Sequence, residues 1–167
     1  VPIPFTSLLL FILLPAFGII DFKQAVSSFG NHVIILLMGA FLLAKGLESS
    51  QVHKRIAFNI IGFIGGTSAF RIVFAFMCAS AILSMWISNT ATVLALLPVA
   101  VAIASASDNK AFAIALLLGL AYSASVGGVG TLIGTPPNVI FASVYENFAG
   151  EEFGFVRWMQ IGVPVIL

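Results

Sequence analysis

Long apolar runs alternate with short clusters of charged residues along this chain. The charges gather at 21–23, 45–55, 71, 108–110 and 146–157, and the stretches between them carry none. Residues 1–20 and 24–44 hold 20 and 21 uncharged positions, each the length of one membrane-spanning helix. The pattern therefore predicts membrane-spanning helices within residues 1–47, and the start of a further span within 151–167.

Residues 48–66 differ from these runs, because their apolar positions form only one stripe of a helix. The stripe consists of Val52, Ile56, Ile60 and Phe63, and Gln51, Lys54, Arg55 and Asn59 lie largely off it. This pattern predicts an amphipathic helix lying in the membrane interface with its basic residues at the lipid headgroups. An ordinary loop helix is the alternative. Five Lys and Arg residues fall on the same side of the membrane as this helix, and two fall on the other side. Because cytoplasmic loops carry the excess of Lys and Arg, we expect this helix on the cytoplasmic side.

The uncharged run 72–107 has 36 residues, about 54 Å of helix at 1.5 Å per residue, whereas a bilayer core is about 30 Å thick. Its middle holds a cluster of polar side chains, Ser88-Asn89-Thr90. The arms on either side, 72–87 and 91–107, are each about 25 Å long, slightly short for a crossing. We expect a re-entrant helical hairpin over 68–107 whose tip, at 88–90, lies inside the membrane.

The next uncharged run, 111–145, is interrupted twice, by Gly127-Gly128-Val129-Gly130 and by Gly134-Thr135-Pro136-Pro137-Asn138. Glycines weaken a helix, and two consecutive prolines remove two amide donors. The sequence therefore predicts a broken helix over 111–149. Its first part covers 111–126, an unwound segment covers 127–136, and a second helix starts at about Pro137.

Composition sets the class of protein. Hydrophobic residues make up 60% and charged residues 8% of the 167, the mean hydropathy is +1.16 and the net charge is +1. A soluble domain carries about 25% charged residues, so these values exclude a soluble enzyme, a disordered segment and a nucleic-acid binder. The single Cys78 excludes an intramolecular disulfide. The chain starts with Val1 and stops within an apolar run, from which we expect it to be a piece of a longer polypeptide.

Two irregular segments at membrane depth predict one shared polar site, because unpaired backbone groups survive there only when buried or lining a cavity. Broken helices offer amides to an anion and carbonyls to a cation. Ser84 and Ser88 are four residues apart on one helix face, and Ser88, Asn89 and Gly134 add carbonyl oxygens suited to Na⁺. Thr90 is expected to cap the second arm and, with Thr135, to donate to a carboxylate.

The same residues have simpler interpretations. Ser and Thr in membrane helices often bond the preceding turn, and the proline pair can be a mere kink. Gly130 and Gly134 fit close helix packing, and Ser123, Ser125 and Asn138 line a cavity or serve packing alone. A channel with 127–135 as its pore loop and a purely structural subunit are further alternatives.

Three segments carry a resemblance to a known family. They are Ser84-Met85-Trp86-Ile87-Ser88-Asn89-Thr90-Ala91-Thr92, Ala121-Tyr122-Ser123-Ala124-Ser125-Val126-Gly127-Gly128 and Gly130-Thr131-Leu132-Ile133-Gly134-Thr135-Pro136-Pro137-Asn138. With the basic segment 53–55 before them, they resemble the divalent anion/sodium symporter family of dicarboxylate and citrate carriers. The likeness covers roughly residues 25–165.

The resemblance implies an all-α polytopic membrane protein built of two inverted repeats. This chain corresponds to one half, with scaffold helices in 1–47 and half of a moving transport domain in 67–150. It implies a homodimer when full length and an elevator-like motion. The sodium site falls on Ser84, Ser88, Asn89 and Gly134, and the substrate carboxylate on Ser88, Asn89, Thr90 and Thr135. The chain carries one copy of each motif, where the family has a second set in its other repeat.

The function expected from both arguments is sodium-coupled symport of a di- or tricarboxylate such as succinate, malate or citrate, as part of a transporter and not an enzyme. A sulfate permease or a dicarboxylate exchanger of the same fold is the alternative. No cofactor beyond the coupling Na⁺, no other metal and no nucleic acid is expected. The expected location is a bacterial inner membrane, with the bilayer as the surrounding partner.

Overall fold

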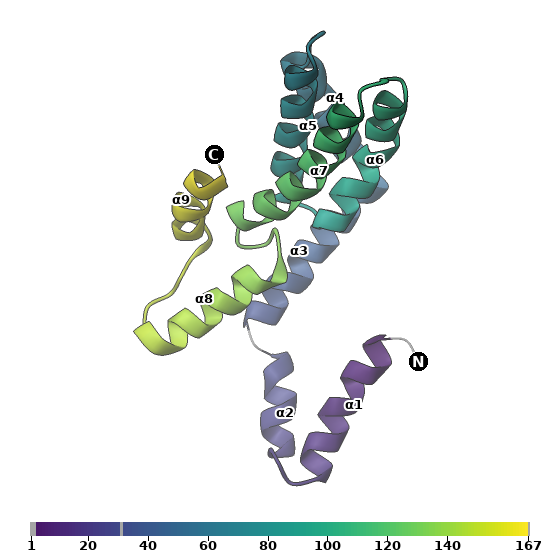
Figure 1. The fold of residues 1–167 in the computed structure, drawn as a ribbon. Coiled ribbons are helices and arrows are strands. Elements are labelled where there is room, and N and C mark those ends of the chain that lie inside the picture. Colours follow the sequence, from purple (N-terminus) through teal and green to yellow (C-terminus); the bar gives the residue numbers. More distant parts are fainter. Residues whose placement is uncertain (1–2, 31, 167) are drawn as a thin grey trace. The chain divides into compact units, whose positions relative to one another are not determined.

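The computed structural model describes residues 3–30 and 32–166, and every regular element among them is helical (Figure 1). The chain divides into two compact units, one ending at Met38 and the other beginning at Gly39, within the same helix α3 (His32–Ser49). The prediction of an all-helical chain is confirmed.

The first unit contains α1 (Ile3–Ala16), α2 (Phe22–Phe29) and the start of α3. Most of its apolar side chains are exposed, among them Phe5 at 63% and Phe17 at 75%. A surface of this kind needs an apolar environment or a packing partner. The two spans expected before residue 47 correspond to three helices among the described residues, and the chain turns between α1 and α2 at Gly18 (φ +68°).

The second unit is built around α5 (Ala69–Ser84), α6 (Asn89–Ser105) and α7 (Lys110–Gly127), which run alternately up and down beside one another (Figure 1). Ser68 caps α5 and Asn109 caps α7 through side-chain oxygens. The core consists of fully buried Phe76, Leu96, Leu116 and Leu120 together with small residues such as Ala79 and Ala100.

Small residues bring α5 and α7 close together. A Cβ atom on Gly119 would lie 3.1 Å from the side chain of Met77, and one on Gly127 would lie 2.4 Å from the backbone oxygen of Ala81. Close backbone approach through glycine and alanine is typical of helix pairs in membranes. The end of α7 is therefore fixed against α5 one turn before α5 ends.

The helix α4 (Val52–Ile64) follows α3 after a bend of 70°, with Gln51 in the left-handed region (φ 55°) at the corner. Three of the four residues of the apolar stripe are exposed, Phe63 by 91%, and the fourth, Ile60, is partly buried against the core. His53 and Ala57 are the buried residues of this helix. His53, which sits beside Lys54 and Arg55 in the sequence, is turned inward, and its Nδ1 lies 2.9 Å from the carbonyl oxygen of Leu47. A carbonyl only accepts, so Nδ1 carries the proton and holds the corner.

The remaining elements are the 3₁₀ turn η1 (Gly128–Gly130), α8 (Pro136–Ala149) and α9 (Phe155–Ile166), and η1 packs against α9. Within the described residues, one uninterrupted helical stretch, Lys110–Gly130, has the length and hydropathy of a membrane span. The bent pair Ile34–Ser49 and Val52–Ile64 makes a second if it is counted as one broken span.

Candidate functional site

The first part of the site is the turn between α5 and α6. α5 ends at Ser84, residues 85–88 leave the helix, and α6 begins at Asn89. Ser88 has extended backbone angles (φ −60°, ψ 146°), and its Oγ accepts a hydrogen bond of 3.2 Å from the amide of Ala91. The residue that caps α6 is therefore Ser88 and not Thr90, and Asn89 and Thr90 belong to the first helical turn.

A hydrogen bond spans this turn. The Ser84 hydroxyl donates to Asn89 Oδ1 over 2.5 Å, and Ser84 is completely buried. Two of the four residues proposed from sequence as cation ligands thus touch each other across the helix break.

The second part of the site is the interruption between α7 and α8. The α-helix stops at Gly127, η1 continues to Gly130, and residues 131–135 are not helical before α8 starts at Pro136. Thr135 precedes the helix with extended angles (φ −148°, ψ 142°) and makes no side-chain capping bond. The second helix starts at Pro136, one residue earlier than the sequence predicted. The unwound segment is shorter than the predicted 127–136, because the first part of the break keeps 3₁₀ geometry.

The two breaks are in contact. A Cβ atom on Gly128 would lie 2.7 Å from Asn89 Oδ1, so the backbone of the second break lies directly against the side chain of the first. The Thr131 hydroxyl donates to the carbonyl oxygen of Met85 over 2.5 Å, although the two residues are 46 positions apart in the chain. The expected meeting of the two irregular segments is therefore present in the structure.

Gly134 joins the same cluster. A Cβ atom there would lie 2.4 Å from the carbonyl oxygen of Gly128, too close for any side chain. Contacts therefore connect Ser84 to Asn89, Asn89 to Gly128, and Gly128 to Gly134.

The residues expected to hold a carboxylate are more open. Ser88 and Thr90 are exposed and Thr135 is half-buried. Within the part of the chain that the structure describes, no hydrogen bond joins Thr90 to Thr135. Their hydroxyls stand at the beginnings of α6 and α8, at the surface of the cluster formed by the two breaks.

Asn138 and Thr131, which the sequence analysis gave no specific role, support the site, and Thr92 is buried in the first turn of α6. Asn138 donates from Nδ2 to the carbonyl oxygens of Gly128 and Thr131, at 2.8 Å each, and is nearly fully buried. Thr131 also accepts from the amide of Gly134 at 3.1 Å. Thr92 is fully buried, and its hydroxyl has no hydrogen-bond partner among the described residues. A buried amide in an apolar run needs partners, which is the signal that singles out Asn138.

The site is uncharged. Residues 84–92 and 127–138 contain no Asp, Glu, Lys or Arg. In the described parts of the chain, no group of three or more His, Cys, Asp or Glu residues is arranged to hold a metal ion. The oxygens at the breaks are hydroxyls, amides and backbone carbonyls.

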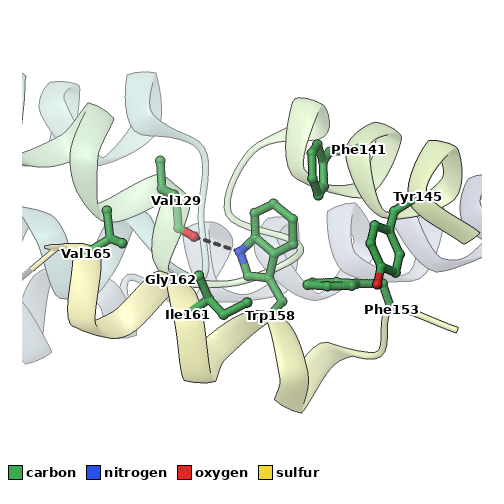
Figure 2. A pocket seen from close by; sticks show the side chains of 8 residues that line it. All are labelled: Val129, Phe141, Tyr145, Phe153, Trp158, Ile161, Gly162 and Val165. Atoms are coloured by element: carbon green, nitrogen blue, oxygen red, sulfur yellow. Dashed lines mark hydrogen bonds between the residues drawn. The ribbon is translucent and has the colours of Figure 1, made fainter. Parts of the chain in front are cut away.

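An apolar cavity of about 320 Å³ adjoins the second break (Figure 2). Its lining comes from η1, α8, α9 and the loop between the last two: Val129, Phe141, Tyr145, Phe153, Trp158, Ile161, Gly162 and Val165. The polar side-chain groups of this lining are the Tyr145 hydroxyl and the Trp158 indole N–H, which already donates to the Val129 carbonyl oxygen, so the cavity is unsuited to a small anion.

Polar groups gathered at two helix breaks within an apolar, all-helical chain are typical of membrane transport proteins. A family model described as citrate transporter matches residues 1–167, and the chain belongs to that family of integral membrane proteins. The resemblance drawn from the motifs is thereby confirmed, and so is the expectation that the chain is not an enzyme.

The curated relatives are similar over the whole chain. It is 39% identical over 178 residues to the sodium-dependent dicarboxylate transporter SdcS of Staphylococcus saprophyticus, and 38% identical to SdcS of Staphylococcus aureus. Each alignment covers 100% of this chain and 34% of the relative. The chain thus spans about a third of the length of these relatives.

Proposed function

We propose that this chain forms the first half of a transport domain that carries a di- or tricarboxylate together with Na⁺. The observation that carries the proposal is the contact between the two helix breaks, where Asn89 Oδ1 lies against both Ser84 and the Gly128 backbone. The names of the SdcS relatives, which describe sodium-dependent dicarboxylate transporters, support the same substrate class.

The cation is assigned to Ser84, Ser88, Asn89 and Gly134. Na⁺ is a hard cation that takes oxygen ligands, and these residues offer hydroxyl, amide and carbonyl oxygens without a formal charge. The absence of any acidic residue from 84–92 and 127–138 argues against a divalent cation, which usually takes carboxylate ligands. It also argues against a proton relay, which needs a titratable group.

The substrate carboxylate is assigned to Ser88, Asn89, Thr90 and Thr135. The amides of Asn89 and Thr90 precede the first intrahelical bond of α6, from Thr92 N to Ser88 O at 3.0 Å, and the start of a helix favours an anion. α8 contributes differently, because Pro136 and Pro137 have no amide hydrogens. The hydroxyl of Thr135, which makes no capping bond, is therefore its donor to the substrate.

The architecture follows the same proposal. α5 and α6 have 16 and 17 residues, about 25 Å of helix each, and we assign them to a re-entrant hairpin that does not cross the membrane. α7 and α8 form the discontinuous helix, residues 48–66 the cytoplasmic interface helix, and residues 1–47 the scaffold. The full-length protein is a homodimer of inverted repeats in a bacterial inner membrane, by the family resemblance.

Uptake by the full-length protein in liposomes tests the proposal. Labelled succinate, malate, citrate and sulfate are offered separately with an inward Na⁺ gradient, and again with K⁺ in its place. We expect uptake of a carboxylate only with Na⁺, and loss of nearly all of it in Asn89→Ala. Asn147→Ala, which changes an exposed asparagine on α8, is the matched control and should keep full uptake.

The outcomes separate the alternatives. Sulfate uptake alone indicates a sulfate permease, and uptake driven only by internal dicarboxylate indicates an exchanger. Sodium-independent carboxylate uptake of normal size contradicts the coupling, and unsaturable ion currents indicate a channel.

A further inference from the structure

The glycine-rich turn at the second break is held from two sides. On one side, Gly128 lies against Asn89, and its carbonyl accepts from Asn138 at 2.8 Å. On the other, the indole Nε1 of Trp158 donates to the carbonyl oxygen of the next residue, Val129, at 2.7 Å (Figure 2). Two adjacent residues of this turn therefore have different neighbours: Gly128 contacts the proposed cation site, and Val129 contacts helix α9.

The backbone of α9 is also pressed against this turn. A Cβ atom on Gly162 would lie 2.6 Å from the carbonyl oxygen of Val129 and 3.1 Å from that of Gly130. Trp158 and Gly162 lie one turn apart on α9, and both are close to the carbonyl oxygen of Val129. Trp158 donates a hydrogen bond to it, and the backbone of Gly162 packs against it. Any bulkier residue at 162 displaces either α9 or the turn.

An aromatic cluster fixes the indole. The Trp158 ring is 5.8 Å from the rings of both Phe141 and Phe153, at angles of 71° and 80°. Edge-to-face contacts of this kind are favourable and directional. The Arg157 guanidinium lies 5.2 Å from the centre of the Phe153 ring, within cation–π range, and pairs with Glu151 at 3.3 Å.

The turn itself has little rigidity of its own. Three of its four residues from Gly127 to Gly130 are glycine, and glycine gives the backbone many accessible conformations. Ligand atoms bind a cation tightly only when they are already held in place. Trp158 supplies such a constraint from outside the ligand set.

We propose that Trp158 is a positioning residue of the cation site: its hydrogen bond to Val129 holds the Gly128–Gly130 turn against Asn89 and so sets the affinity for Na⁺. This rests on the proposed function of the same site. α9, assigned from sequence only as the start of another span, becomes part of the ion-binding unit.

The test is sodium-dependent carboxylate uptake by the full-length protein in liposomes, normalised to the amount of protein incorporated. Trp158→Phe keeps an aromatic ring in the cluster and removes the indole donor. We expect the Na⁺ concentration for half-maximal uptake to rise about fivefold, which corresponds to ~1 kcal/mol. The half-saturating carboxylate concentration, measured at saturating Na⁺, should change less than twofold.

Two further variants sharpen the result. Tyr145→Phe keeps the ring of a neighbour in the same aromatic cluster and removes a hydroxyl that has no hydrogen-bond partner among the described residues, and its half-maximal Na⁺ concentration should stay within twofold. Trp158→Tyr also keeps an aromatic ring and removes the indole donor, and should raise the Na⁺ requirement as Trp158→Phe does. It tests the proposal by itself if the Trp158→Phe variant does not reach the membrane.

An unchanged Na⁺ requirement in the variant that is recovered overturns the proposal, as does a fall in maximal rate with no change in Na⁺ requirement, because that indicates a merely structural role. An unsubstituted protein whose uptake ignores Na⁺ contradicts the proposed function itself. The two failures are thus distinguishable.

Discussion

The hydroxyl of Ser84 and the side-chain oxygen of Asn89 lie 2.5 Å apart and close the turn between α5 and α6. The last residue of one helix is thereby bonded to the first residue of the next. Only the hydrogen of the Ser84 hydroxyl is used in this bond, so lone pairs on both oxygens stay available to a cation.

Ser84→Ala removes one proposed cation ligand and one hydrogen bond. We expect the half-maximal Na⁺ concentration for uptake to rise about tenfold, and the free energy of unfolding to fall by only about 1 kcal/mol. Sodium titration of uptake and thermal unfolding in detergent measure the two effects.

Ser80→Ala is the matched control for this change. Ser80 is equally buried one turn earlier on α5, and its hydroxyl donates to the carbonyl of Leu120 at 3.0 Å. It should lose stability and keep its Na⁺ requirement. Identical sodium titrations for the two variants would argue against Ser84 as a ligand.

Glycines at the second break should differ in what they tolerate. The three atoms nearest to a Cβ atom on Gly128 all belong to the Asn89 side chain, which can move, so we expect Gly128→Ala to give a folded protein with a strongly raised Na⁺ requirement. Gly127→Ala meets the backbone of Ala81 at 2.4 Å and should fail to fold. A Cβ atom on Gly154 would have no other atom within 4 Å, so Gly154→Ala should behave as the unsubstituted protein. Fluorescence-detected size-exclusion chromatography and uptake together report the three outcomes, and a fully active Gly128→Ala variant would contradict the assigned geometry.

Asn138→Ala tests the support of the unwound segment. The change leaves two buried carbonyl oxygens, those of Gly128 and Thr131, without this donor. We expect a loss of about 2–4 kcal/mol in the free energy of unfolding, since each unsatisfied buried group costs about 1–3 kcal/mol. A change no larger than that of the exposed control Asn147→Ala would show that the two bonds contribute little.

Thr92→Val addresses the buried hydroxyl that has no partner in the described structure. Valine has nearly the same shape, and removing an unsatisfied hydroxyl should raise the unfolding free energy by about 1 kcal/mol while uptake continues. Thermal unfolding in detergent measures the gain. A loss of Na⁺-dependent uptake instead would identify the Thr92 hydroxyl as a ligand group.

The sequence located both helix breaks because each depends on local chemistry. The Ser88 hydroxyl accepts a hydrogen bond from the amide of Ala91, the third residue of α6, and short polar side chains are preferred at such capping positions. The proline pair favours the start of α8. Boundaries still moved by one to four residues. Thr90 was the wrong choice of cap, because Ser and Thr both suit that position and only the backbone angles distinguish Ser88.

Other relationships could not be predicted from local pattern. The stripe of Val52 and Phe63 predicted a helix in the membrane interface, and both residues are exposed in the structure, but the pattern did not show that His53 and Ala57 are the buried residues of α4. In an apolar environment an exposed apolar face costs nothing, so hydrophobic periodicity no longer identifies the packed side.

The sequence by itself determined that the chain is apolar and helical and that its helices break at two glycine-, proline- and serine-containing segments, because propensity and capping act over a few neighbouring residues. Only the tertiary structure decided which atoms meet. The contacts of Asn89 with Gly128, of Thr131 with Met85 and of Trp158 with Val129 join positions 29 to 46 residues apart. They depend on how closely α5, α7 and α9 approach, and that distance is set by the packing of glycine and alanine against whole side chains, which no local pattern encodes.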